Sequence, residues 1–90
     1  MNMEDFGRVA ICALRYAMGQ RNSMPGDIRK AIRPYLSQLS DMHIAVMLDD
    51  CNRQERTQSY GDSMIDKPGW IEWRSILETE QKRRNKYGTH

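Results

Sequence analysis

Apolar residues recur every three or four positions in separate stretches of this chain, and that period constrains the fold more than any other feature. It is the spacing at which side chains line one face of an α-helix. The first stripe predicts a helix over residues 3–18 and consists of Phe6, Val9, Ala10, Ala13, Leu14 and Ala17. No stretch alternates apolar and polar residues for long enough to indicate a strand, so an all-α fold is expected.

Glycine and proline mark the ends of the first two helices. Gly19 is expected to close the first helix in a left-handed conformation, and Pro25 suits the first turn of the second. Pro34 interrupts the second stripe, because proline lacks an N–H and disfavours helix at the residue before it. A kink is one alternative, but we favour a break followed by a short second piece. This stripe comprises Ile28, Ala31, Ile32, Tyr35, Leu36 and Leu39.

Two further helices are expected in the second half of the chain. Ser40 suits the N-cap of the third, and that helix ends before Gly61. Pro68 opens the last helix, with Asp66 or Lys67 at its cap. The inward residues are Ile44, Met47, Leu48 and Cys51 in the third helix, and Trp70, Trp73, Ile76 and Leu77 in the fourth. The sequence therefore predicts a compact bundle of four to five short helices.

This bundle is expected to be one domain over residues 1–90, with a charged helix end at about residues 78–90. Apolar residues make up 39% of the chain and charged residues 29%, which suits a small core with a charged exterior. A net charge of +2 does not by itself indicate nucleic-acid binding, because DNA-binding domains usually carry a denser basic face, and it has the wrong sign for a phosphate mimic.

Location and redox state follow from short signals. The acidic start over residues 1–5 lacks the basic region of a signal peptide, and no apolar stretch is long enough to span a membrane. A cytoplasmic protein is therefore expected. Cys12 and Cys51 are accordingly predicted to be reduced thiols that act as small hydrophobic residues.

Catalytic and metal-binding patterns are missing from the sequence. The adjacent Asp49 and Asp50 would point about 100° apart on a helix and cannot form an acid–base pair. His43 and Cys51 stand eight positions apart, too far to hold one ion by themselves. We therefore expect no enzyme activity, no metal and no cofactor, and we place His43 at the surface or at the boundary of the core.

Two groups of basic residues are the candidate partner-binding residues. Arg8, Arg15 and Arg21 form the first group. The alternative for Arg15 and Arg21 is a structural role, in ion pairs with Asp49 and Asp50 that fix the first helix against the third. The second group is Lys82, Arg83, Arg84 and Lys86. Its alternative is a solvated helix end, where cations complement the helix dipole, and either way we expect it to contribute little to folding.

Trp70 and Trp73 share a helical face and are expected in the core. The alternative is an interface, because aromatic residues concentrate binding energy there.

The pattern Arg15-Tyr16-Ala17-x-Gly19-x-Arg21, followed by Met24-Pro25, resembles small accessory proteins of phages and prophages of Gram-positive bacteria. The likeness continues through residues 60–70 and extends to about Trp73. It implies a phage origin and carries over no catalytic residue.

The resemblance favours a non-enzymatic interaction protein that binds and inhibits a host protein in the host cytoplasm. By analogy with anti-CRISPR proteins, which are also small and phage-encoded, a CRISPR nuclease or another defence component is a candidate partner. The alternative function is a small helical nucleic-acid-binding or regulatory domain. A homodimer also stays open, because a second copy could supply burial that a short chain lacks.

Overall fold

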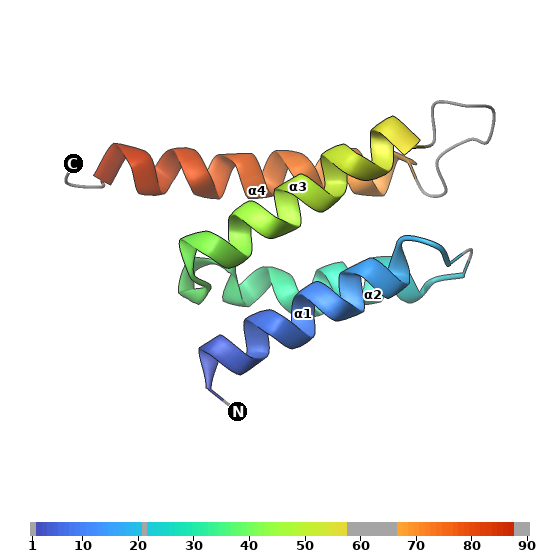
Figure 1. Ribbon diagram of the computed structural model, residues 1–90, viewed down its shortest axis with the longest axis horizontal. Coiled ribbons are helices and arrows are strands. Elements are labelled where there is room, and N and C mark those ends of the chain that lie inside the picture. Colours follow the sequence, from blue (N-terminus) through green and yellow to red (C-terminus); the bar gives the residue numbers. More distant parts are fainter. Residues whose placement is uncertain (1, 21, 58–66, 88–90) are drawn as a thin grey trace.

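The computed structural model describes residues 2–20, 22–57 and 67–87, and the side chains of residues 55–57, 86 and 87 are outside that description. Four α-helices follow one another, with a 3₁₀ helix, η1, between the second and third (Figure 1). The helices are α1 (Met3–Ala17), α2 (Met24–Ile32), η1 (Arg33–Gln38), α3 (Asp41–Thr57) and α4 (Lys67–Tyr87). No strand occurs within these ranges, and the predicted all-α bundle of short helices is confirmed.

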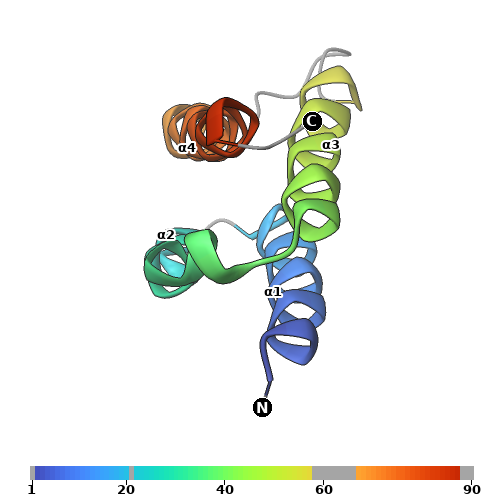
Figure 2. The same ribbon diagram turned by 90° about the vertical axis from the view of Figure 1, so that its left-hand side faces the viewer.

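Helix α3 occupies the middle of the bundle. It packs against α1 on one side and against α4 on the other, while α2 packs on α1 and η1 contacts α4. Figure 2 shows the result: α1 and α3 form one side of the molecule, and α2 and α4 form the other. The apolar core lies between the four helices.

Local sequence signals set most of the helix ends. The Ser40 hydroxyl accepts a hydrogen bond from the His43 N–H at 3.1 Å, which confirms the predicted N-cap of α3. Asn2 caps α1 in the same way, accepting from the Asp5 N–H at 2.8 Å. The expectation for Gly19 is wrong, because its backbone is not left-handed. Instead, α1 ends in a tightened turn in which the Gln20 N–H donates to the Ala17 carbonyl at 3.0 Å.

Pro34 breaks the second helical stretch, as favoured from the sequence. Helix α2 ends at Ile32, and the chain continues in the tighter 3₁₀ form of η1. The physical reason is that proline has no N–H for an α-helical hydrogen bond and its ring crowds the preceding turn. The break redirects the chain, so that Leu36 and Leu39 enter the core from η1 and the residue after it.

The core contains most of the predicted apolar residues. Its buried members are Ala10, Ile11, Leu14, Ala17, Ile32, Leu36, Leu39, Ile44, Met47, Leu48, Cys51, Trp70, Trp73 and Leu77. Three expectations are wrong: Val9 is 52% exposed, Tyr35 is 45% exposed, and Ala31 is exposed. Ile11 is buried and Val9 is not, because the face that α1 turns toward α2 and α3 is rotated slightly from the predicted apolar stripe.

Neither Cys12 nor Cys51 forms a disulfide bond. Cys51 lies in the core, as expected of a small hydrophobic residue, whereas Cys12 lies on the outer side of α1. The contact between α1 and α3 therefore depends on side-chain packing and polar contacts and not on a disulfide bond between Cys12 and Cys51.

His43 corrects a further expectation, because its side chain is 1% exposed rather than at the surface. The first half of α1 lies over it, and a Cβ added at Gly7 would overlap the imidazole ring. The His43 Nε2 atom lies 3.4 Å from a carboxylate oxygen of the exposed Glu4. Among the described residues, neither ring nitrogen has a hydrogen-bond partner. Gly7 therefore permits the close approach of α1 and α3.

We expect Trp73→Ala to lower the free energy of unfolding by about 3–5 kcal/mol, because Trp73 is 2% exposed and its removal leaves a large cavity. A domain of this size has little stability to spare. Ile71→Ala is the matched control, since Ile71 lies two residues away on the exposed side of α4, and its cost should be about 1 kcal/mol at most. Urea denaturation measures both, and equal losses would contradict the placement of α4.

We expect Gly7→Ala to lower the free energy of unfolding by about 1–3 kcal/mol, because the new methyl group overlaps the His43 ring. Gly26→Ala is the control: its methyl group meets only the end of the Arg29 side chain, and alanine should stabilise α2 by about 0.5–1 kcal/mol. Adding His43→Ala should remove the penalty at Gly7 in a double-mutant cycle. An additive double mutant in thermal melts would show that the two residues are not in contact.

Candidate functional site

Arg15 joins α1 to α3. Its Nε donates to the Asp50 Oδ2 at 2.7 Å and its Nη2 donates to Oδ1 at 3.3 Å. Asp50 is buried, and these hydrogen bonds together with its charge raise the pKa of Arg15. The structural alternative considered for Arg15 is therefore confirmed for this pair. Asp49, in contrast, pairs within α3 with Arg53, one turn further along.

The other two members of the first basic group differ in what the structure describes. Arg8 is exposed and forms an ion pair with Asp5 in the first turns of α1; this hydrogen bond and the Asp5 charge raise the pKa of Arg8. Arg21 lies outside the described residues. Of the three arginines proposed from the sequence, Arg8 is thus exposed on α1, and Arg15 links α1 to α3.

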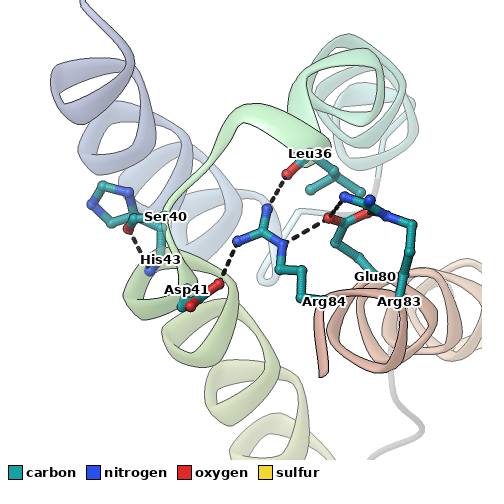
Figure 3. A network of polar contacts seen from close by, with 7 residues as sticks. All are labelled: Leu36, Ser40, Asp41, His43, Glu80, Arg83 and Arg84. Atoms are coloured by element: carbon teal, nitrogen blue, oxygen red, sulfur yellow. Dashed lines mark hydrogen bonds and ion pairs between the residues drawn. The ribbon is translucent and has the colours of Figure 1, made fainter. Parts of the chain in front are cut away.

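Arg84 is the centre of a polar network where η1, the start of α3 and the last turns of α4 meet (Figure 3). Its guanidinium donates to the Leu36 carbonyl of η1, to Asp41 at the start of α3 and to Glu80 of α4, each at 2.7 Å. The Arg83 Nε donates to the other oxygen of Glu80 at 3.2 Å. Three elements therefore meet at a single side chain.

This network corrects the expectation that all the cations near the C-terminal end contribute little to folding. The Arg84 side chain is 18% exposed and binds a backbone carbonyl as well as two carboxylates. Burial disfavours its charged form, but the hydrogen bonds to Glu80 and Asp41 outweigh that effect, so the pKa of Arg84 is raised. Hydrogen bonds from Arg83 and Arg84 in turn lower the pKa of Glu80. Arg84 is thus a residue that orients α4.

The remaining cations of this group lie on the outside of α4. Lys82 and Arg83 are exposed, while the side chain of Lys86 is not among those described. Arg83 also borders the groove described next. Of the second basic group, Lys82 and Arg83 are therefore the residues that the structure places within reach of a partner.

A groove runs along the side of the molecule where α2 and η1 face α4. It consists of two neighbouring hollows of about 410 and 300 Å³, which share Arg33 and Ile76 as lining residues. The first lies between η1 and α4 and includes Leu36 and Thr79, and the second lies between α2 and α4 and includes Trp73. Apolar side chains therefore line the floor of a groove whose edges are charged.

One wall of this groove is basic. Arg29, Lys30 and Arg33 line it from α2 and η1. The Arg29 guanidinium also stacks over the Trp70 ring at 4.5 Å from the ring centre, which fixes it by a cation–π contact. Lys30 and Arg33 are exposed, and neither takes part in any ion pair within the described parts of the chain.

The sequence pattern did not single out this wall. Residues 29, 30 and 33 have the spacing at which basic side chains share one side of a helix. The proline at position 34 predicts a break beside this basic side but does not indicate what the side faces. Only the position of α4 across from these residues makes them the edge of a groove.

The described helices carry no metal cluster. Among residues 2–20, 22–57 and 67–87, no three His, Cys, Asp or Glu side chains gather closely enough to hold a metal ion. None of the helices in those ranges has the length and apolar character needed to cross a bilayer. Comparison with protein-family models, with curated proteins and with solved structures found no match to this chain.

We expect Arg84→Ala to lower the free energy of unfolding by about 1–3 kcal/mol, because it removes the donor to the Leu36 carbonyl and to Glu80. Arg83→Ala is the control on the neighbouring residue: it breaks a more exposed ion pair with Glu80 and should cost about 1 kcal/mol or less. Chemical denaturation of both variants measures the two losses in the free energy of unfolding. If Arg83→Ala proves the more damaging change, Arg84 does not orient α4.

Proposed function

We propose that this chain acts by binding another protein and has no catalytic role. The observation that carries the proposal is the groove between α2, η1 and α4, which combines apolar lining residues such as Ile76 with an exposed basic wall. Protein-binding sites have this anatomy, with an apolar centre that excludes water and a polar rim that sets orientation.

The resemblance to small phage accessory proteins extends the proposal to the kind of partner. A phage-encoded protein of this size would act on a host protein and inhibit it, and a CRISPR nuclease or another defence component is one candidate. This part of the proposal rests on the pattern over residues 15–25. The groove supports only the more general statement that a protein partner is bound.

Nucleic-acid binding is the second candidate function. It is favoured by Lys30 and Arg33 at the groove edge, which form no ion pair with any described residue and could contact phosphates. The opposite wall opposes it through Glu72, which lines the same groove and would repel a phosphate backbone, whereas Glu80 is already paired with two arginines of α4. The apolar residues on the floor also have no role in contacts to phosphates. A protein partner therefore fits the groove better.

Affinity capture from a nuclease-treated lysate of a Gram-positive bacterium tests the proposal. We expect the immobilised chain to retain a protein partner that survives nuclease treatment and forms a defined complex with the purified chain in size-exclusion chromatography. Trp73→Ala serves as the control bait, since an unfolded chain reports non-specific hydrophobic capture.

The competing function makes a different forecast. A nucleic-acid-binding domain would shift short DNA or RNA in a gel assay at low salt, and the complex would weaken steeply as salt is added. If the chain shifts nucleic acid in this way and captures no protein after nuclease treatment, the interaction proposal is wrong.

A further inference from the structure

The shape of the groove limits what can occupy it. Its lining residues on α4 run from Gly69 to Arg83, and at 1.5 Å per residue this corresponds to about 21 Å of helix. An extended peptide of about six residues has the same length. The two hollows meet at Ile76, so a chain lying along the groove could place one side chain in each of them.

The charges of the groove select the kind of chain. Four basic residues line it, Arg29, Lys30, Arg33 and Arg83, against two acidic ones, Glu72 and Glu80. Glu80 is already neutralised by its hydrogen bonds to Arg83 and Arg84. The groove therefore has an excess of positive charge, concentrated on the α2 and η1 wall. An incoming segment with negative side chains toward that wall would form ion pairs that Lys30 and Arg33 do not form with any described residue.

The lining also provides for backbone and apolar contacts. Ser37 of η1 and Ser75 and Thr79 of α4 border the first hollow and can hydrogen-bond a peptide backbone. Ile76 and the edge formed by Trp73 offer apolar contact between the charged walls. We infer that the groove binds an acidic peptide segment of a partner protein, whose apolar side chains enter the two hollows while its carboxylates face Lys30 and Arg33. This inference rests on the proposed function and specifies its site and its partner chemistry.

A library of displayed peptides tests the inference directly on the purified chain. Yeast-displayed random peptides are selected on the full chain, and the most enriched peptide is synthesised with a fluorescent label for polarisation titrations. We expect enrichment of Asp and Glu interspersed with Leu, Ile, Met or Phe. Enrichment of basic or uncharged sequences would overturn the assignment of an acidic partner.

Variants then locate the bound peptide. Lys30→Glu combined with Arg33→Glu should weaken binding about tenfold or more, because it places two repulsive charges beside the peptide carboxylates. Ser75→Trp should abolish most binding by filling the first hollow from an exposed position. Lys67→Glu is the matched control: it reverses an exposed charge on α4 that borders neither hollow, and affinity should stay within about twofold. Thermal melts confirm that all three variants are folded.

The outcomes separate this inference from the broader function. If Lys30→Glu/Arg33→Glu binds the selected peptide as tightly as the unaltered chain, or if Lys67→Glu weakens binding equally, the groove is not the acidic-peptide site. A protein captured from the lysate would still uphold the interaction function in that case. Displacement of the peptide by a short DNA duplex at physiological salt would instead assign the groove to nucleic acid and overturn the inference.

Discussion

Burial of the apolar stripe on α3 is the constraint on which the rest of this fold depends. Ile44, Met47, Leu48 and Cys51 are all buried, and α3 contacts both α1 and α4. A helix that is covered on two sides cannot turn without exposing one of its neighbours to water. The positions of α1 and α4, and through them of α2 and η1, therefore follow from how α3 is placed.

Polar contacts act on this arrangement as orienting ties. Arg15 holds α1 to α3 through the buried Asp50, and Arg84 holds α4 to η1 and to the start of α3. Moving either arginine away would leave a buried carboxylate or carbonyl oxygen without a hydrogen-bond donor, which costs free energy of folding. Arg15 lies in the last turn of α1 and Arg84 in the last turn of α4, where a small tilt of either helix would displace the charged group most. They restrict the helices to one relative orientation that apolar packing alone would leave less well defined.

The same ties divide the basic residues by role. Arg84 and the half-exposed Arg15 each bind a carboxylate of α3. The exposed Lys30, Arg33 and Lys82, in contrast, form no ion pair within the described residues. A cation whose charge is already matched within the protein has less to offer a partner than one that is hydrated. The exposed wall formed by α2 and η1 is therefore a better candidate for contact with a partner than the basic run at the end of α4. That wall faces the apolar residues of the groove, which gives a partner both charge and burial.

Some features of this fold depend only on residues that are near neighbours in the chain. The helical period of the apolar residues, the break at Pro34 and the cap at Ser40 all act within about one turn of the chain, so they could be predicted without knowing what packs where. In contrast, the burial of His43 beneath Gly7, the outward position of Val9 and the groove bordered by α2 and α4 arise only when the helices pack together. These outcomes depend on the faces that distant helices present to one another. Several faces of α1 satisfy the same period, and only contact with α2 and α3 selects one of them.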